Sequence, residues 1–398
     1  MPCAPATGSP AQMHDKETRH RALEWAEHRH ISAKPYRFLW VLCAAAVLVS
    51  GVAIAKPPPI HHVFMIVLEN EGYTSVTSPR AASVYLGRKL PRHGALLTRY
   101  YAVGHASLDN YIAMISGQPP NANTQYDCLI FNDFVVEHST LNEEGIAIGR
   151  GCIYPFTVKT LADQLEAKGL TWRAYMEDMG NDSKREAATC GHSAVGAVES
   201  SLGATIGDQY AARHNPFIYF HSLIDDQKRC DQHVVPLTAL PADLAHAAAT
   251  PNFVFITPNL CHDGHDAPCV DAEPGGLWSI DRFLRSWVPA ILQSAAFKKD
   301  GLLIVTFDEG EDSAACCGER PLAGSALSPG ISGPGGGRIA TVLVSPFIRP
   351  GTRSAHYYNH YSLLRSIEDI FALSHLAYAA PPQLRSFGTD VYTRAARQ

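Results

Sequence analysis

Two pairs of oxygen-bearing side chains, Glu69-Asn70 and Asp308-Glu309, are candidates to hold a metal ion. Each pair directly follows an apolar run that is typical of a buried strand. Adjacent carboxylates repel each other unless a cation or a shared proton compensates. A polar turn is the alternative for either pair alone, but the repeated construction favours a metal site. Ligation by oxygen suits Mg²⁺, Ca²⁺ or Mn²⁺, and Zn²⁺ also accepts carboxylates.

Ser107, in the stretch HASLDNY, is the candidate nucleophile. The stretch has the pattern of a tight turn that opens a helix, where free backbone N–H groups and the positive helix end favour an anion. A serine in this position could attack phosphorus once a metal has lowered the pKa of its hydroxyl. A serine that only caps the helix is equally compatible with the sequence.

Histidines at predicted strand ends and helix starts form a third group of candidates. The chain has 19 histidines, and a lone histidine is usually structural or solvated. A cluster that is flanked by acidic residues in a strand-end loop is a better candidate for contact with a ligand or a phosphate, and CHDGHD has this form. The candidates are His105, His262, His265 and His360.

The elements that must position these side chains alternate between strands and helices. Apolar runs at Ile60–Leu68 and Leu302–Thr306 predict the strands that precede the two pairs. Strands alternating with helices predict an α/β fold, a three-layer sandwich with a mostly parallel central sheet. If the two strands are neighbours, both pairs lie at the edge where ligands bind in such folds. Further strands are predicted at Ala95–Ala102, Trp172–Met179, Phe217–Phe220, Phe253–Thr257 and Arg338–Val344, and helices at Ala82–Leu90, Thr157–Lys168, Leu277–Ala295 and Tyr361–Ala372.

Some classes of protein are disfavoured by the sequence. The formal net charge is -5, so the chain has no overall positive charge that would attract nucleic acid. No G-x-S-x-G motif is present, which disfavours a serine hydrolase of the α/β-hydrolase type. The glycine-rich stretch Ile331–Gly337 lacks the Lys and Ser/Thr of a P-loop and is interpreted as a surface loop.

Residues 1–55 have the character of a leader. Phe38–Ala55 is continuously apolar or small, and it ends in Ala53-Ile54-Ala55, a cleavage pattern of a signal peptide. An uncleaved N-terminal anchor is the alternative, because this run is close to the minimum length for a membrane span. Either interpretation predicts an exported body, secreted or periplasmic, with membrane attachment only if the leader stays in place.

The cysteines agree with export. Eight of the ten lie outside the leader, and an even number in an exported domain predicts disulfides. Pairing in sequence order is the simplest arrangement, although it includes a bridge between adjacent residues. A cysteine zinc site is disfavoured because these eight contain no C-x-x-C pair. The predicted pairs are Cys128 with Cys152, Cys190 with Cys230, Cys261 with Cys269, and Cys316 with Cys317.

Five stretches in fixed order resemble the motifs of the bacterial phosphoesterase family that contains acid phosphatases and phospholipases C, within the alkaline-phosphatase-like superfamily. They are VLENEGY, HASLDNYIAMISG, ITPNLCHDGHD, TFDEGED and HYSLLRSIEDIFAL. The similarity runs from about Ile60 to Ala372, and the joint order of the motifs makes it specific. It implies an alkaline-phosphatase-like catalytic domain over residues 56–398.

The resemblance also implies roles for individual residues. Ser107 would be the nucleophile and, in the resting enzyme, a ligand of a divalent metal ion. The other metal ligands would be Glu69, Asn70, Asp308 and Glu309. The residues that line the phosphate pocket would be His105, Asn110, His262, His265 and His360.

The function that the resemblance implies is a secreted, metal-dependent, acid-phosphatase-like phosphoesterase that works through a phosphoserine intermediate. Family acid phosphatases often carry Asp-Asp where this chain has Asp308-Glu309. Family phospholipases tend to have E-N-R-S-F-D, whereas Glu69-Asn70 is followed here by Glu71-Gly72-Tyr73. The alternatives are a phospholipase C that acts on phospholipid head groups and a non-catalytic binding protein on the same fold. A sulfatase is disfavoured because SLDNY does not match C/S-x-P-x-R.

Overall fold

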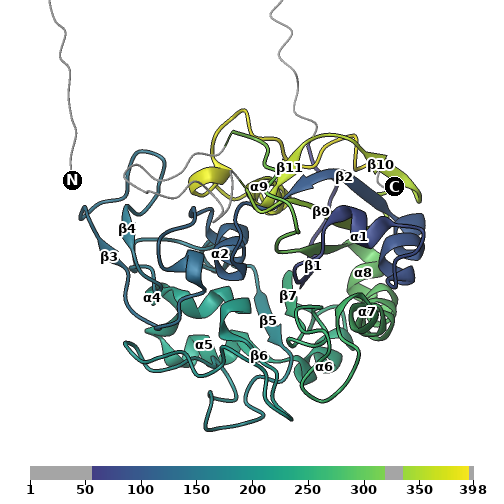
Figure 1. Ribbon diagram of the computed structural model, residues 1–398. Coiled ribbons are helices and arrows are strands. Elements are labelled where there is room, and N and C mark those ends of the chain that lie inside the picture. The colour runs from purple at the N-terminus through teal and green to yellow at the C-terminus, as the bar shows by residue number, and fades with distance from the viewer. Residues whose placement is uncertain (1–55, 319–334, 394–398) are drawn as a thin grey trace, which may run out of the picture. The chain divides into compact units, whose positions relative to one another are not determined.

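The computed structural model describes residues 56–318 and 335–393 (Figure 1). The predicted leader, and most of the predicted glycine-rich loop at 331–337, lie outside the described residues. Among the described residues, no helix combines the length and the apolar character that crossing a bilayer requires.

A nine-stranded mixed sheet forms the centre of the domain. Its strands follow the order β10-β2-β9-β8-β1-β7-β5-β6, and β11 pairs with β2. Of the strands in the described part of the chain, only β9 runs antiparallel to its neighbours in this sheet, so the prediction of a mostly parallel sheet is confirmed. The strands are β1 (His62–Leu68), β2 (Ala95–Tyr101), β5 (Trp172–Met176), β6 (Val234–Pro236), β7 (Phe253–Thr257), β8 (Gly301–Phe307), β9 (Arg338–Val344), β10 (Thr352–Ser354) and β11 (Tyr358–Asn359).

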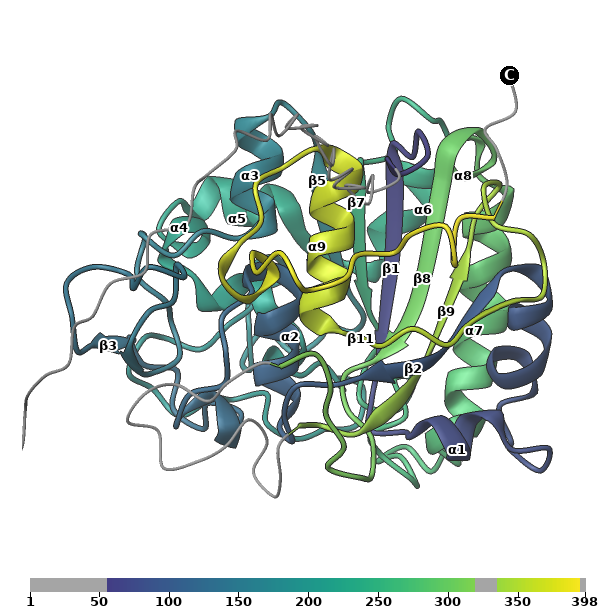
Figure 2. The ribbon, with the colours of Figure 1, turned by 90° about the horizontal axis from the view of Figure 1, so that it is seen from above.

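The middle of the sheet is apolar on both faces, as a strand between two helical layers requires. β1 lies between β7 and β8, as Figure 2 shows. Every residue of β1 and of β8 is buried. The register places Leu68 beside Phe307, so the residues that follow the two strands emerge side by side.

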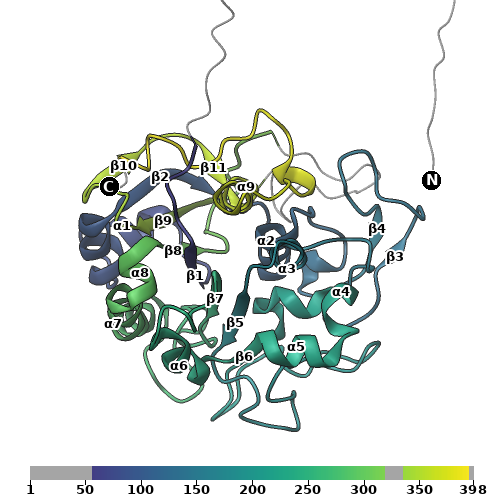
Figure 3. The same cartoon turned by 180° about the vertical axis from the view of Figure 1, so that it is seen from behind.

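Helices cover both faces of the sheet and complete the predicted three layers. Figures 1 and 3 show α2, α3 and α9 on one face, and α6, α7 and α8 on the other. α9 shows the periodicity behind this arrangement, because its apolar residues recur along the face that packs on the core. The helices are α1 (Tyr73–Thr77), α2 (Ser107–Ser116), α3 (Leu161–Ala167), α4 (His221–Ile224), α5 (Gln227–His233), α6 (Leu240–Leu244), α7 (Gly276–Gln293), α8 (Ala295–Asp300) and α9 (His360–Phe371).

Two predicted elements differ from the structure. The strand predicted at Phe217–Phe220 is wrong, because Pro216–Tyr219 forms a 3-10 helix. Pro216 has no N–H to donate to a sheet, and a run of four apolar residues does not distinguish a strand from a helical turn. The helix predicted at Ala82–Leu90 is instead a short π-helical turn followed by a 3-10 turn.

All four predicted disulfides are present, including the bridge between adjacent residues. Cys128–Cys152 ties together the excursion that carries the small hairpin of β3 (Val135–Val136) and β4 (Gly149–Arg150). Cys261–Cys269 closes the loop that carries the sequence CHDGHD.

Candidate active site

The pairing of β1 with β8 brings Glu69 and Asp308 to one edge of the sheet. The backbone N–H of Asp308 donates to the carbonyl of Leu68 at 2.9 Å, which continues the ladder past both strands. Asp308 Oδ1 accepts from the backbone N–H groups of Asn70 at 3.1 Å and Glu309 at 2.6 Å. The side chains of Glu69 and Asp308 are fully buried. The predicted convergence of the two pairs is therefore present in the structure.

Ser107 points at this acidic centre from the first turn of α2. Its hydroxyl donates to Glu69 Oε2 at 2.8 Å, and the Tyr111 hydroxyl, one turn later, donates to Glu69 Oε1 at 2.6 Å. The N-cap of α2 is Ala106, which makes no side-chain cap. Ser107 is thus not the capping residue, and the alternative interpretation of this serine does not apply.

Asn110 shapes the loop that presents Ser107. Its Oδ1 accepts from the backbone N–H groups of Val103 at 2.9 Å and Gly104 at 3.1 Å. Its Nδ2 donates to the carbonyls of Gly104 at 2.9 Å and Ala106 at 3.0 Å. These four bonds use the whole hydrogen-bonding capacity of a buried amide. Asn110 thus holds the loop before α2 in this structure, and its contact with phosphate stays a prediction.

His214 completes the centre and was absent from the sequence-based candidates. Its Nδ1 lies 3.1 Å from Asp263 Oδ2, and its Nε2 lies 3.3 Å from Glu69 Oε2 without hydrogen-bonding geometry. The ring stacks on Tyr111 with centroids 5.4 Å apart. Burial, followed by the charges of Arg213 and His265, lowers the pKa of His214 well below its usual value, which leaves the imidazole neutral.

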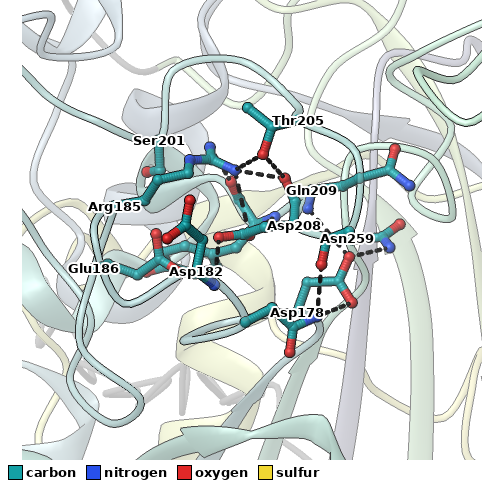
Figure 4. A network of polar contacts seen from close by, with 12 residues as sticks. Asp178, Asp182, Arg185, Glu186, Ser201, Thr205, Asp208, Gln209 and Asn259 are labelled. Carbon is teal, nitrogen blue, oxygen red and sulfur yellow. Dashed lines mark hydrogen bonds and ion pairs between the residues drawn. The ribbon is translucent and has the colours of Figure 1, made fainter.

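Figure 4 shows a polar network around Asp178, Arg185 and Asp208, and Asp208 lies six residues before His214 in the sequence. Asp178, which follows β5, accepts from the backbone of Gln209 at 3.1 Å and from Asn259 Nδ2 at 2.7 Å. Arg185 donates to the hydroxyl of Thr205 at 3.1 Å and pairs with Asp208 at 3.3 Å. Next to His214 itself, the Thr257 hydroxyl at the end of β7 donates to the His214 carbonyl at 3.1 Å. The histidine is therefore fixed to the central sheet.

Two predicted histidines contact the acidic pair after β8. His105 Nδ1 lies 2.6 Å from Glu309 Oε2, which orients the Glu309 side chain toward His105. His360, the first residue of α9, places Nε2 2.6 Å from the Asp308 carbonyl oxygen. Its Nδ1 lies 3.1 Å from the Tyr100 hydroxyl. Burial lowers the pKa of His360 to about 4, so the ring is neutral at physiological pH.

The two histidines of CHDGHD have different partners. His262 Nδ1 lies 3.0 Å from both oxygens of Glu177, and its pKa is raised by this carboxylate against the opposing effect of burial. His265 lies 2.8 Å from Asp266 and 3.2 Å from Arg213 Nη2. His265 therefore belongs to a charged group beside His214, whereas His262 is held by the loop after β5.

Burial and mutual repulsion raise the pKa values of the carboxyl groups in the centre. Burial is the larger cause for Glu69, and the charges of Asp308 and Asp263 add to it. Burial, followed by Asp308, raises the pKa of Glu309 to about 10. Burial, followed by Glu309, raises the pKa of Asp109 well above its usual value. Such a cluster does not ionise fully unless a cation offsets the charge.

Several buried atoms of the centre lack a hydrogen-bond partner among the described residues, which fits a metal ion. They comprise Asn70 Oδ1, Asp308 Oδ2, His214 Nε2 and both carboxylate oxygens of Asp109. Unpaired polar atoms are rare inside proteins and call for an explanation such as an ion. Ligand atoms of Glu69, His214 and Asp263 also lie within 4.8 Å of one another. Carboxylate and imidazole ligands suit Zn²⁺ and Mn²⁺.

The match to a known family agrees with this geometry. Residues 61–374 match the sequence profile of the phosphoesterase family. The chain belongs to the phosphoesterase family. Members that resemble it are not restricted to bacteria, because most of the relatives found are fungal.

Three proteins illustrate the similarity. A phosphate-repressible acid phosphatase of Penicillium chrysogenum is 29% identical, over 84% of this chain and 64% of its own length. A phosphatidylinositol-3-phosphatase of Mycobacterium tuberculosis is 25% identical, over 83% of this chain and 84% of its own. A solved protein of the alkaline phosphatase superfamily from Vibrio parahaemolyticus aligns over 84% of this chain and 72% of its own, with 12% identity and a TM-score of 0.48. The chain spans about three fifths of the fungal acid phosphatases.

Proposed function

We propose that this member of the phosphoesterase family is a metal-dependent hydrolase of phosphate esters, of the acid phosphatase type, with Ser107 as its nucleophile. The observation that carries the proposal is the 2.8 Å contact between Ser107 Oγ and Glu69 Oε2 inside a buried acidic centre. A serine that only stabilised a helix would not require buried carboxylates around its hydroxyl group. The named relatives that are acid phosphatases support the same reaction class.

The metal ion would be held by Glu69, Asn70 and Asp308, with His214 and Asp263 as further candidates. Their unpaired oxygen and nitrogen atoms suit such an ion, and the imidazole favours Zn²⁺ or Mn²⁺ over Ca²⁺ or Mg²⁺. When bound, the ion would stabilise negative charge on the serine oxygen and on the phosphoryl group. The Glu309 carboxylate faces His105, and we propose that it contributes to the metal site from the side on which His105 lies.

The residues of the chain supply the remaining steps. Glu69 orients the Ser107 hydroxyl and accepts its hydrogen bond. The bond between Ser107 Oγ and phosphorus forms as the bond from phosphorus to the alcohol oxygen breaks, and the alcohol leaves with a proton. Water then attacks the phosphoserine, which releases inorganic phosphate and restores the hydroxyl. We propose that four histidines contact the phosphate group or the residues that bind it. They are His105, His262, His265 and His360.

The proposal is tested by hydrolysis of p-nitrophenyl phosphate, measured from acid to alkaline pH with and without a chelator. Ser107→Ala should abolish turnover, and the chelator should reduce it in the wild-type protein. Ser116→Ala, at the other end of α2, is the matched control and should retain activity. Full turnover by Ser107→Ala would refute the assigned nucleophile. Absence of turnover by the wild-type protein with metal bound would favour the non-catalytic alternative.

Export is part of the proposal. It rests on the leader-like residues 1–55 and on the disulfides of the body. The protein recovered from the periplasm or the medium is expected to begin near Lys56. N-terminal sequencing checks this, and recovery of the intact leader in the membrane fraction would indicate an anchor instead.

A phospholipid is a second candidate substrate, since one relative is named a phosphatidylinositol-3-phosphatase. Exposed large apolar side chains are concentrated between residues 126 and 206, which would suit contact with a lipid surface. Phosphate release from phosphatidylcholine vesicles that contain phosphatidylinositol 3-phosphate tests this candidate. Turnover of p-nitrophenyl phosphate without release from vesicles would restrict the substrate to soluble esters. The exposed side chains are Tyr126, Leu129, Ile130, Val135, Val136, Phe156, Val195, Val198 and Ile206.

A further inference from the structure

A cavity of about 190 Å³ lies beside the N-terminus of α9, at the same end of the sheet as Ser107. Its walls include two tyrosine rings, Tyr361 and Tyr378, which meet edge to face with centroids 5.3 Å apart. Leu384 and Cys317, a member of the disulfide between adjacent residues, add apolar surface. A space of this size accommodates a single six-membered ring, since a cavity of roughly 150 Å³ is known to bind benzene.

Three segments connect this cavity to the candidate active site. Asn359 and Tyr361 flank His360, whose Nε2 lies 2.6 Å from the Asp308 carbonyl oxygen. Tyr361 and Leu384 belong to one apolar cluster with Val103, in the loop that leads to Ser107. The chain from Asp308 to Gly318 also runs from the acidic centre to the cavity wall. The cavity is therefore placed to receive the part of a substrate that is attached to the phosphate.

The polar groups of the cavity select among ligands. Asn359 is fully buried, and its Oδ1 accepts from the Ser362 backbone N–H at 2.9 Å. Its Nδ2 has no hydrogen-bond partner among the described residues, so it can donate to an oxygen of a ligand. Glu144 is the one charged side chain among the described residues that line the cavity. The Glu144 carboxylate can accept a hydrogen bond from a hydroxyl group of a ligand, and its negative charge disfavours a second phosphate beside it.

We propose that this cavity binds the alcohol portion of the substrate, and that this portion is a neutral, polyhydroxylated six-membered ring. The ring would pack against Tyr361 and Tyr378, accept a hydrogen bond from Asn359 and donate one to Glu144. Apolar ring faces with hydroxyl edges are the features of a sugar or of a cyclitol. A quaternary ammonium group also packs on tyrosine rings, but it offers no oxygen to Asn359. The inference rests on the proposed phosphoesterase activity.

The test compares three phosphomonoesters that share a primary-alcohol leaving group: glucose 6-phosphate, glycerol 3-phosphate and phosphocholine. The wild-type kcat/KM for glucose 6-phosphate should exceed that for glycerol 3-phosphate by about tenfold, a normal gain for filling an apolar pocket. Tyr378→Ala should remove most of this ratio, and Tyr378→Phe should keep it. Trp278→Ala, which removes an exposed aromatic ring on α7, is the matched control and should leave the ratio unchanged. Preference for phosphocholine that depends on Tyr378 would overturn the proposal.

A binding measurement separates this inference from the catalytic one. Saturation-transfer NMR with methyl glucoside, which carries no phosphate, should show contact with the wild-type protein and with Tyr378→Phe, but not with Tyr378→Ala. Equal kcat/KM values for glucose 6-phosphate and glycerol 3-phosphate, together with no contact with methyl glucoside, would refute the proposed role of the cavity. The proposed phosphatase activity would be unaffected by that result. myo-Inositol 1-phosphate distinguishes the source of the ring. Dependence on Tyr378 that is greater for this ester than for glucose 6-phosphate supports a lipid head group, and the reverse supports a free sugar phosphate.

Discussion

Ser107 and His214 approach the same carboxylate oxygen, Glu69 Oε2, at 2.8 Å and 3.3 Å. The serine reaches it from the first turn of α2, and the histidine from a loop that is tied to the end of β7. Because the histidine is buried and neutral, its Nε2 can offer a lone pair to a cation rather than a charge to the carboxylate. The two residues therefore approach one position from two separate elements.

Ser107→Ala is expected to lower kcat by a factor of roughly 10⁴ to 10⁶, as removal of a catalytic nucleophile does in serine proteases. It should also abolish the covalent phosphoenzyme that acid quenching traps from radiolabelled substrate. Ser116→Ala should change neither result. A phosphoenzyme that persists in Ser107→Ala would place the nucleophile elsewhere.

His214→Ala is expected to weaken metal binding by at least tenfold, because it removes a buried nitrogen that faces Glu69 and Asp263. Equilibrium dialysis against graded chelator concentrations, followed by elemental analysis of the protein, measures the change without reference to activity. The matched control is His221→Ala, on the partly exposed helix α4. Unchanged metal content in His214→Ala would show that this histidine positions Glu69 without binding the ion.

Glu368→Gln should stabilise the protein increasingly as the pH rises from 4.5 to 8. Burial raises the pKa of Glu368 in α9 from 4.5 to about 8, so the folded chain keeps a proton that the unfolded chain has released. In this window the free energy of unfolding of the wild-type protein falls by about 1.4 kcal/mol per pH unit through this group. Glutamine resembles the neutral carboxyl and removes that loss.

Urea unfolding of Glu368→Gln and of the wild-type protein at several pH values provides the measurement. The difference between their free energies of unfolding should grow across the window and level off above pH 8. Glu143→Gln, at an exposed position, is the control and should follow the wild-type curve. A difference that does not vary with pH would contradict the assignment.

Removing the Cys190–Cys230 disulfide should destabilise the protein more than removing Cys261–Cys269. The first closes a loop with a sequence separation of 40 and the second one of 8. Loop entropy in the unfolded chain then predicts a loss of about 4 kcal/mol against about 2.5 kcal/mol. Each double Cys→Ala variant loses two buried sulfur atoms. The difference between their free energies of unfolding, measured by chemical denaturation, therefore reports the difference between the two loops. The opposite order would indicate that the loop of CHDGHD contributes through its native contacts.

Local patterns were sufficient to predict much of the fold. The apolar runs predicted β8 and β9, and the apolar periodicity predicted α9, because burial and helical repeat are recorded in neighbouring residues. The same reasoning was wrong at Phe217–Phe220, where four apolar residues follow Pro216. It also left the direction of β9 open, since a buried strand has the same composition whether it runs parallel or antiparallel.

Glu69 and Asp308 were identifiable from the sequence because each directly follows a predicted buried strand. The residue type alone shows that each carries a carboxylate that can bind a metal ion. His214 was not identifiable, because it precedes a short turn and meets Glu69 only through contacts distant along the chain. The hydrogen bonds by which Asn110 holds the loop before α2 were not predictable either, since they depend on how that loop folds back. The sequence by itself determined which residues could do chemistry and the elements that carry them. Only the tertiary structure decided which of them meet, because strand order and loop path depend on packing between distant segments.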